Sequence, residues 1–403
     1  MKALFLTREY PPYVYGGAGV HVEYLSRELA KLIDVEVRCF GDQEYKEGNL
    51  VVKGYDYDKK VFENCDSKLK SPFSSLGNCI NFNAQPIDAQ VVHCHTWYSH
   101  FGGILAKKAY GIPNIITTHS LEPLRPWKRE QLGLGYDLSL WVEKTAIESA
   151  DAIIAVSKEM KDDIVRLFDV DPKKISVIYN GIDTDEYKKV QTRDSLLENG
   201  INPDIPYILF VGRITRQKGI IHLVNAIKYI NEDVQVILCA GQPDTEEIGI
   251  EMEEGIKKVQ EKRKNVVWIR KWLPKKPMIE IFSNAAVFCC PSIYEPFGLI
   301  NLEAMACGTA VVASAVGGIK EVVEHGKTGY LVEFEQHKES PFEAISPDQF
   351  SRDIASNINK LMDDEHLRKE MGEAGRKRAE AFFSWKTIAK ETLELYNRLK
   401  AEG

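Results

Sequence analysis

Two glutamates in the second half of the chain, Glu295 and Glu303, have the spacing that is most informative about chemistry. They lie eight positions apart, and a Pro-Phe-Gly turn directly follows the first. Because proline is tolerated in the first turn of a helix, we expect a helix to begin at Pro296 or Phe297. Glu295 would then lie in the loop before the helix, and Glu303 about two turns inside it, roughly 12 Å along the axis.

The predicted separation of these two carboxylates is too large for a single glycosidic bond. Carboxylates that flank such a bond in a hydrolase lie about 5 to 9.5 Å apart. A wider pair suits a long, segmented ligand, and the positive end of the helix dipole would face the same ligand. A sugar nucleotide, with its sugar, diphosphate, ribose and base, has that shape.

A short basic segment follows an earlier expected strand. Gly212 and then Arg213 follow the apolar run Tyr207–Val211, and Lys218 precedes a helix expected from Gly219. Arginine binds phosphate through two parallel hydrogen bonds and lysine acts as a mobile point charge, so the two together suit a diphosphate. They would also stabilise the charge of a departing diphosphate. Alone this segment would be a solvated basic loop; beside the two glutamates it predicts a diphosphate site.

A glycine-rich segment follows the first expected strand. Gly16, Gly17 and Gly19 precede a helix expected from Val20, and glycine lets the backbone approach a phosphate or a sugar at a helix start. The final glycine of the dinucleotide fingerprint is replaced by Val22, and no Gly-Lys-Ser/Thr ends the segment. The segment therefore indicates phosphate or sugar contact rather than NAD or a Walker A loop.

Several polar residues follow the other strands of the first half. Glu9 and Tyr10 are candidate acceptor-binding residues, and His119 ends an expected strand, where it is either structural or a substrate contact. His93 and His95 share one strand face, but no further ligand pattern accompanies them, so no metal site is predicted.

Short apolar runs alternate with helical patterns through the whole chain, which is typical of parallel sheets covered on both faces. The expected strands are Ala3–Leu6, Val35–Phe40, Val91–Cys94, Asn114–Thr118, Ala152–Val156 and Ile175–Ile178 in the first half, and Tyr207–Val211, Val234–Cys239, Val266–Ile269, Ala286–Cys289 and Ala310–Ala313 in the second. Helices are expected over Val20–Leu32, Gly102–Tyr110, Asp137–Ser149, Lys158–Phe168 and about Trp385–Leu399. The sequence predicts an α/β protein of two doubly wound domains, with ligands at the carboxyl ends of the strands.

Bulk composition limits the classes of function. The 403 residues suit two domains, and a net charge of -7 disfavours nucleic acid as the main partner. Most of the eight cysteines lie in apolar surroundings, so reduced buried thiols are expected rather than a disulfide framework. The first residues enter a strand directly and no apolar run is long enough to span a membrane, so we expect a cytoplasmic protein.

In this order along the chain, the motifs resemble the retaining glycosyltransferases of the GT-B fold, family GT4, and above all their glycogen synthase-like branch. The segments Thr7–His21 and Pro291–Gly298 are the strongest points of likeness, and Asn180-Gly-Ile-Asp183 adds another. The resemblance implies two Rossmann-like domains that face a central cleft. An acceptor-side domain would span residues 1–198, with a C-terminal helix, 378–403, packed back on it, and a nucleotide-sugar-binding domain would span 199–377.

The resemblance also implies a reaction. Glucose would pass from a nucleoside-diphosphate glucose, ADP-glucose in the first place, to a 4-hydroxyl with retention of configuration. By this likeness Arg213 and Lys218 hold the diphosphate and Glu303 holds the ribose hydroxyls. Glu295 faces the donor sugar, and His119 faces its 6-hydroxyl.

The same likeness assigns further donor contacts. The N–H groups of Phe297, Gly298 and Leu299 face the other sugar hydroxyls or the phosphate, and Asn180 is also expected at the donor. The nucleotide sugar is a substrate, so neither a cofactor nor a metal is expected. The expected partners are this donor and an α-glucan or a sugar phosphate, with homo-oligomers left open.

Two departures from the glycogen synthase pattern leave the substrates open. Tyr13 and Tyr15 stand where related enzymes carry a lysine before the double glycine, and Thr96 replaces the aspartate of His-x-His-Asp-Trp. Glucose 1-phosphate, which would give maltose 1-phosphate, is therefore as good an acceptor as a glucan chain, and UDP-glucose remains open as donor. Other hypotheses are a GT-B sugar-nucleotide 2-epimerase and a non-catalytic sugar-nucleotide or glucan-binding protein.

Overall fold

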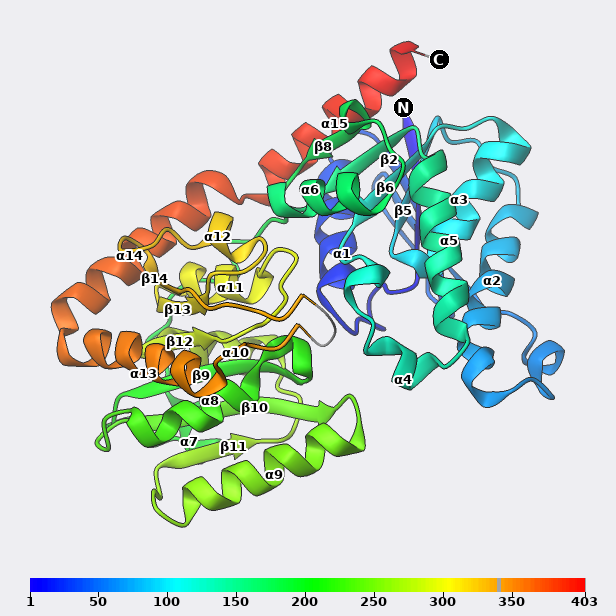
Figure 1. Ribbon diagram of the computed structural model, residues 1–403. Coiled ribbons are helices and arrows are strands. Elements are labelled where there is room, and N and C mark those ends of the chain that lie inside the picture. Colours follow the sequence, from blue (N-terminus) through cyan, green and yellow to red (C-terminus); the bar gives the residue numbers. More distant parts are fainter. Residues whose placement is uncertain (339–341, 403) are drawn as a thin grey trace. The chain divides into compact units, whose positions relative to one another are not determined.

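A computed structural model describes residues 1–338 and 342–402 and divides the chain into two compact units (Figure 1). The first unit comprises Met1–Gly181 with Trp385–Gly403, and the second comprises Ile182–Ser384. Each unit has its own sheet with helices on its faces, which confirms the predicted pair of doubly wound α/β domains.

The first unit is built on an eight-stranded sheet in the order β3-β4-β2-β1-β5-β6-β7-β8. Its strands are β1 (Lys2–Thr7), β2 (Asp34–Phe40), β3 (Glu44–Glu47), β4 (Leu50–Tyr55), β5 (Val91–His95), β6 (Asn114–Thr118), β7 (Ala152–Ala155) and β8 (Ile175–Val177). All neighbours are parallel except β3 and β4. The central strands β5 and β6 are buried at every residue, because helices cover both faces of the sheet.

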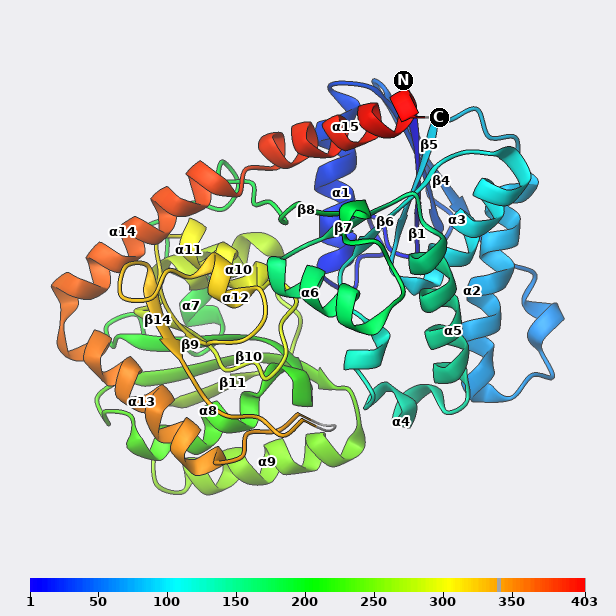
Figure 2. The ribbon, with the colours of Figure 1, turned by 45° about the horizontal axis from the view of Figure 1, so that its top comes forward.

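The helices of the first unit include one from the far end of the chain. They are α1 (Gly17–Ala30), α2 (Ser67–Ala84), α3 (Trp97–Tyr110), α4 (Lys128–Leu132), α5 (Gly135–Ser149), α6 (Lys158–Leu167) and α15 (Trp385–Glu402). Helix α15 lies beside α1 in both ribbon views (Figure 2). The Trp385 ring stacks on Tyr24 at 5.7 Å between centroids, and the Tyr396 hydroxyl lies 2.6 Å from His93 Nδ1. The C-terminal helix thus completes the core of the first unit.

The second unit has a six-stranded, fully parallel sheet in the order β11-β10-β9-β12-β13-β14. Its strands are β9 (Tyr207–Ile214), β10 (Gln235–Pro243), β11 (Val266–Ile269), β12 (Val287–Cys290), β13 (Ala310–Ser314) and β14 (Gly329–Val332). Its helices are α7 (Asp194–Glu198), α8 (Ile220–Ala226), α9 (Glu246–Gln260), α10 (Lys275–Asn284), α11 (Leu299–Ala306), α12 (Ile319–Val322), α13 (Pro347–Asp363) and α14 (Glu365–Phe382).

Some elements escape prediction for identifiable reasons. Strand β3 is polar and exposed throughout, and it pairs antiparallel with β4 through a turn at Gly48, whose φ is +56°. Helix α2 is rich in serine and asparagine and contains Pro72, so it lacks the usual apolar pattern. The predicted parallel sheets are therefore confirmed, with one antiparallel pair, β3 and β4, at an edge.

The unit boundaries differ from the expected 198/199 and 377/378. Residues 182–198 belong to the second unit because their backbone is bonded to α10: Ser195 N donates to Glu280 Oε1 at 2.7 Å, and Val190 N donates to Ser283 Oγ at 3.1 Å. Residues 378–382 continue α14 and stay with the second unit, and only the chain from Trp385 joins the first.

Two expectations from composition are also met. All eight cysteines are free thiols, and all except Cys65 are buried. Within the part of the chain that the structure describes, no helix combines the length and the apolar character that a membrane crossing requires.

Candidate active site

The carboxyl ends of β9 and β10 place a cation beside a carboxylate. Strand β9 continues to Ile214, so Arg213 is the last residue but one of the strand and does not follow it as predicted. Arg213 Nη1 lies 2.8 Å from Asp244 Oδ1, just beyond β10. The Arg213 side chain keeps about 38% of its surface exposed, so a ligand phosphate can still reach it.

Lys218 and Glu295, which the sequence assigned to one ligand, are in direct contact. Lys218 Nζ lies 2.6 Å from Glu295 Oε2, and the Ser292 hydroxyl donates to the same oxygen at 3.3 Å. Both charged side chains are largely buried, with 22% and 10% of their surfaces exposed. The pair is self-neutralising, and the Lys218 ammonium has three N–H donors, so a diphosphate can bind it beside Glu295 or in place of Glu295.

Two loops that hold this ion pair are fastened to each other. A single turn of 3-10 helix, η4 (Arg216–Lys218), is capped by Thr215, whose Oγ1 accepts from Lys218 N at 3.2 Å. Gln217 O accepts from Ile293 N at 2.9 Å. Gly219 follows with φ +60°, and a Cβ there would lie 2.0 Å from Pro291 O. Only glycine permits this approach, which fixes Lys218 beside Glu295.

The helix after Glu295 begins later than predicted. Helix α11 starts at Leu299, and Gly298 has φ +96°, which a right-handed helix cannot contain. The residues before α11 pack instead on the glycine pair Gly317–Gly318. Gly318 N donates to Glu295 O at 3.0 Å, and a Cβ on Gly317 would lie 1.9 Å from that oxygen. The prediction of a helix from Pro296 or Phe297 is wrong, and Glu303 lies about one turn inside α11 rather than two.

Glu303 occupies an unusual electrostatic environment for a carboxylate. Burial raises its pKa to about 7, against a smaller opposing effect from the Tyr187 hydroxyl, which donates to Oε1 at 3.3 Å. Its carboxyl group therefore exchanges a proton near neutral pH.

The backbone between Glu295 and α11 carries the remaining predicted donor contacts. The Phe297 side chain is 2% exposed and its ring lies against Phe383, so a ligand contact at this residue would have to come from its backbone. The same restriction to the backbone holds for Gly298, which has no side chain.

In the first unit the predicted phosphate-binding glycines surround a carboxylate. Helix α1 begins at Gly17 rather than at Val20. Glu9 Oε2 accepts from the N–H groups of Tyr15 and Gly16 at 2.8 Å each, and a Cβ on Gly19 would lie 2.8 Å from that oxygen. Glu9 thus occupies the anion-binding position at this helix start.

Three imidazole rings lie close together at the carboxyl ends of β5 and β6. One ligand atom from each of His21, His95 and His119 lies within 4.8 Å of the others. His95 Nδ1 lies 3.1 Å from His119 Nε2, and His21 Nδ1 lies 2.6 Å from Asn180 Oδ1. Asn180, predicted at the donor, therefore contacts His21. The group has the composition of a metal site, but two of the imidazoles already pair with each other, and the absence of a metal stays a prediction.

Burial also fixes the protonation of these histidines. It lowers the pKa of His119 and of His95 well below the ordinary value, so both rings are neutral at physiological pH. Neutral His119 can donate a hydrogen bond to a sugar hydroxyl or accept one from it. His93 is turned to Tyr396 and Thr117, at 2.6 and 2.7 Å, and takes no part in the group.

One predicted acceptor-binding residue belongs to the core. Tyr10 is fully buried among apolar residues, and its hydroxyl lies 2.9 Å from Ser26 Oγ. Its assignment to an acceptor is therefore wrong, whereas Glu9 remains partly exposed.

Sequence reasoning also missed residues that shape the site. They are Tyr187, Asp244, Ser292, Gly317, Gly318 and His21. The Gly-Gly pair after the expected strand Ala310–Ala313 was the one readable signal, because paired glycines after a strand indicate a close backbone approach.

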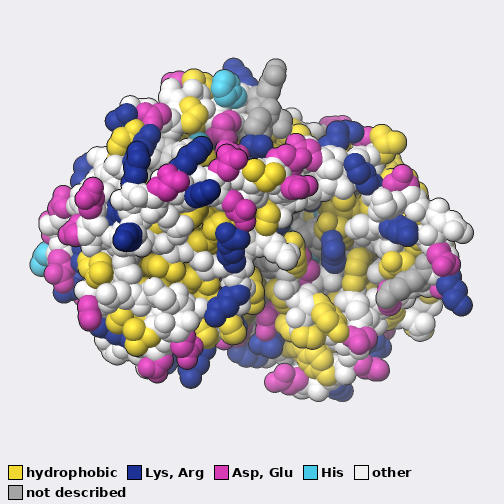
Figure 3. Space-filling model, turned by 90° about the horizontal axis from the view of Figure 1, so that it is seen from below, with side chains coloured by type: hydrophobic (Ala, Val, Ile, Leu, Met, Phe, Trp, Pro, Cys, Tyr) yellow, Lys and Arg dark blue, Asp and Glu magenta, His cyan; other side chains and the backbone are white. Residues whose placement is uncertain are grey.

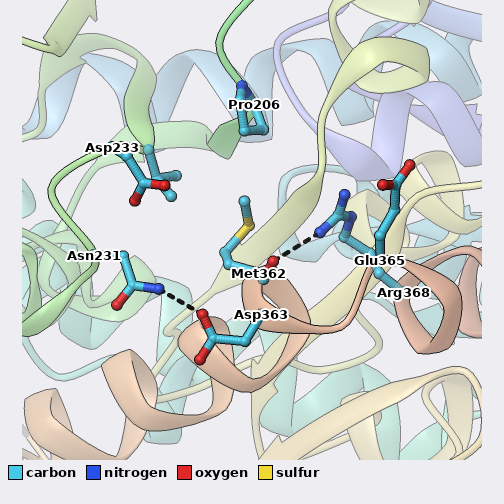
Figure 4. Close-up of a pocket in the computed structure, with 8 residues that line it drawn as sticks. Pro206, Asn231, Asp233, Met362, Asp363, Glu365 and Arg368 are labelled. Carbon is cyan, nitrogen blue, oxygen red and sulfur yellow. Dashed lines mark hydrogen bonds between the residues drawn. The ribbon is translucent and has the colours of Figure 1, made fainter.

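A separate hollow of about 320 Å³ lies at the amino ends of the strands of the second sheet, away from the carboxyl ends that carry Arg213 (Figure 4). Pro206 and Val234 line it, and they directly precede β9 and β10, so it opens at the amino ends of the strands. In the close-up Asn231 donates to Asp363 at 2.8 Å, and Arg368 to the Met362 carbonyl. Arg213 leaves the sheet at the other edge, so this hollow is not the candidate donor site.

Charges of both signs are mixed on one face of the molecule. On the face shown in Figure 3, basic and acidic side chains are interspersed and form no continuous basic stripe.

Known proteins resemble this chain along its whole length. Residues 15–186 match the family described as Glycosyltransferase Family 4, and residues 193–378 match Glycosyl transferases group 1. Alpha-maltose-1-phosphate synthase of Mycolicibacterium smegmatis is 46% identical over 405 residues, and that of Mycobacterium tuberculosis H37Rv is 44% identical; both alignments cover 100% of each chain. Among solved structures, sucrose-phosphate synthase from Thermosynechococcus elongatus superposes with a TM-score of 0.78 at 25% identity and 100% coverage of both chains.

Proposed function

Since this chain belongs to glycosyltransferase family 4, with the GT-B fold, we propose that it transfers glucose from ADP-glucose to the 4-hydroxyl of glucose 1-phosphate and forms maltose 1-phosphate. The observation that carries the proposal is the full-length identity of 46% and 44% with two alpha-maltose-1-phosphate synthases. Nothing in the structure or among the relatives supports the epimerase hypothesis.

The second unit supplies the donor contacts in this proposal. Arg213 and Lys218 hold the diphosphate, and each leaves a carboxylate partner, Asp244 or Glu295, to do so. Ionised Glu303 accepts hydrogen bonds from the ribose hydroxyls. Glu295, once released by Lys218, accepts from hydroxyls of the glucose, and the N–H groups at the start of α11 add further donors.

The bond changes need no protein nucleophile. The bond between C1 of glucose and the β-phosphate oxygen breaks, and a bond from C1 to the acceptor's O4 forms on the same face of the ring. The acceptor proton passes to the departing phosphate oxygen. Arg213 and Lys218 stabilise the negative charge that develops there, which lowers the barrier. Neutral His119 contributes a hydrogen bond to a sugar hydroxyl.

A four-way incubation tests the proposal. ADP-glucose and UDP-glucose are each offered with glucose 1-phosphate or with maltodextrin, and products are identified by mass together with the nucleoside diphosphate released. We expect maltose 1-phosphate and ADP in equal amounts. Elongated maltodextrin without any disaccharide phosphate would refute the acceptor, and faster release of UDP than of ADP would refute the donor.

A further inference from the structure

Two cations of the first unit lie near one aromatic ring at the carboxyl ends of its strands, and a third cation, Arg125, shares the carboxylate Glu122 with one of them. Tyr98 lies in the first turn of α3, directly after β5. Arg8 follows β1, whereas Arg125 and Lys128 follow β6. The Arg8 guanidinium carbon lies 4.2 Å from the centre of the Tyr98 ring, and Lys128 Nζ lies 6.0 Å from it. Because β5 lies between β1 and β6, these segments meet at one edge.

Positive charge is in excess around this ring. Glu122 Oε1 lies 2.8 Å from Lys128 Nζ and 3.7 Å from Arg125 Nη1, so one carboxylate faces two cations. Burial, reinforced by the charge of Glu122, raises the pKa of the neighbouring Glu143 well above its usual range and so favours its protonated form. Arg8 has no ion pair or hydrogen bond within the described ranges 1–338 and 342–402.

The nearby carboxylate of Glu9 reduces this excess without removing it. Its Oε2 accepts from the N–H groups of Tyr15 and Gly16, which are neutral, so Glu9 keeps its negative charge. Arg8, Arg125 and Lys128 against Glu9 and Glu122 leave one positive charge in excess. Lys128 is nine-tenths buried, and its pKa is lowered by burial first and by the charge of Arg125 second. The two cations therefore repel each other in a site of low dielectric, and an anion would relieve that repulsion.

The same edge holds buried polar atoms that lack partners in the described structure. Arg125 Nε and Thr96 Oγ1 are both buried and unpaired, and Arg125 Nη1 reaches only Ser120 Oγ, at 3.3 Å, besides Glu122. Thr96 also has φ +68°, which is rare for a β-branched residue and persists where the surroundings enforce it. Thr96 directly precedes α3 and makes no side-chain hydrogen bond to it; α3 is a helix of 14 residues whose first N–H groups have no intrahelical acceptor.

We propose that Arg8, Arg125 and Lys128 bind the phosphate group of a sugar-phosphate acceptor at the start of α3. The inference rests on the proposed function and adds to it the residues that select a phosphorylated acceptor. A phosphate group brings negative charge to a site where cations are in excess, and two guanidinium groups provide the planar donors that phosphate prefers. The Tyr98 ring fixes the guanidinium of Arg8 by a cation–π contact.

This arrangement predicts discrimination between acceptors. An acceptor without phosphate leaves the cations and the Arg125 Nε group unpaired, and a site built for a polar group rejects ligands that lack it. If the cations only braced α4 and α5, Lys128 and Glu122 would suffice for that role, and exposed Arg8 would be dispensable.

Acceptor kinetics of two variants test the proposal. Arg8→Ala and Arg125→Gln are compared with Arg129→Ala, which removes an exposed arginine that pairs with Asp137. Glucose 1-phosphate and ADP-glucose are varied in turn, and inorganic phosphate is added as a competitor. We expect each of the first two variants to raise the KM for glucose 1-phosphate about 10- to 100-fold. The KM for ADP-glucose stays within about twofold of wild type, and inhibition by inorganic phosphate weakens in parallel.

The outcomes separate this proposal from the proposed function. An unchanged KM for glucose 1-phosphate in Arg8→Ala and Arg125→Gln, with wild-type inhibition by inorganic phosphate, overturns the phosphate site and leaves the glucosyltransferase standing. If Arg125→Gln melts early, exposed Arg8→Ala decides alone. Transfer by the wild type to maltodextrin but not to glucose 1-phosphate also overturns the site. Failure of the wild type to transfer glucose to any acceptor overturns the proposed function itself.

Discussion

In the second unit each cation of the candidate donor site is held by a carboxylate, whereas in the first unit Arg8 meets only an aromatic ring among the described residues. Lys218 pairs with Glu295 and Arg213 pairs with Asp244, so these cations are preorganised and neutralised before a ligand arrives. The first unit instead keeps an excess of positive charge beside Tyr98. If both places bind phosphate as proposed, the second unit does so by exchanging an internal partner and the first unit by meeting an excess positive charge.

Removal of Lys218 should produce the largest effect on the second unit. Lys218→Ala deletes the cation that exchanges Glu295 for the diphosphate and leaves Glu295 buried without its partner. We expect kcat/KM for transfer from ADP-glucose to fall about 10²- to 10³-fold, since one charge-stabilising donor is lost from the transition state. Initial rates over a range of donor concentrations measure this loss.

The control for this variant is Lys276→Ala, which removes an exposed lysine at the start of α10 and should leave the kinetics unchanged. Near-normal turnover by Lys218→Ala, with an unchanged melting temperature, would contradict the assigned role and with it the idea of a preorganised cation.

A backbone substitution tests whether the fastened loops preorganise the ion pair. In Gly219→Ala the new Cβ would lie 2.0 Å from Pro291 O at a φ of +60°. We expect a loss of about 2 to 4 kcal/mol in the free energy of unfolding and a fall in donor affinity, because Lys218 is displaced from Glu295. Urea denaturation and donor titration measure the two effects.

Gly200→Ala is the matched control, because Gly200 also has a positive φ, +76°, but its added Cβ meets no atom within 4 Å. It should cost only about 1 to 2 kcal/mol for the left-handed conformation. Equal costs in both variants would show that the contact with Pro291 does not fasten the loops.

The raised pKa of Glu303 predicts a pH dependence confined to the donor. At a pH below its pKa of about 7, the carboxyl group of Glu303 is mostly protonated and accepts hydrogen bonds from ribose only weakly. Donor KM should therefore rise about tenfold from pH 8 to pH 6, while Glu303→Gln should show a flat donor profile. A pH-independent donor KM in the wild type would exclude Glu303 from the ribose site.

Stability should change in the opposite direction with pH. The folded pKa of Glu303, about 7, lies above its ordinary value of 4.5, so the native state binds more protons than the unfolded state between these values. The contribution of Glu303 to stability is therefore present below about 4.5 and is lost as pH rises through about 7. Melting curves of Glu303→Gln should show a relative gain in stability at pH 8 and none at pH 4.

The smallest effect is expected from a substitution in the exposed ion pair of Arg213 and Asp244. Asp244→Asn frees Arg213 from its internal partner, and ADP affinity should rise by at most about fivefold, because exposed ion pairs are weak. Calorimetric titration with ADP measures the change. Glu253→Gln, which breaks the exposed pair with Arg270, is the control. Weaker ADP binding in Asp244→Asn would mean that Asp244 positions Arg213 rather than competing with the ligand.

The sequence predicted those parts of the site that depend on local order along the chain. Apolar strands followed at once by charged residues placed Arg213 and Lys218 at a carboxyl edge, and the contact between Lys218 and Glu295 joins two predicted motifs 77 positions apart. Family resemblance supplied the C-terminal helix that packs on α1.

The errors arose where distant parts of the chain decide local structure. Helix α11 starts late because Gly317 and Gly318 hold the residues before it in a non-helical conformation, and this contact leaves no periodic signal. Glu9 fills the glycine segment because the chain folds back on itself at the start of α1. The burial of Tyr10, whose hydroxyl contacts the Ser26 hydroxyl, likewise depends on tertiary packing, which the alternation of apolar and polar residues does not reveal.

The anomeric outcome of the first turnovers tests the central claim most directly. Wild-type protein is incubated with ADP-glucose and glucose 1-phosphate, and the new glycosidic bond is followed by proton and phosphorus NMR. The account predicts an α-1,4 bond to glucose 1-phosphate that forms at the rate of ADP release. A β-linked product, an epimerised sugar nucleotide, or ADP release without a new glycosidic bond would contradict it.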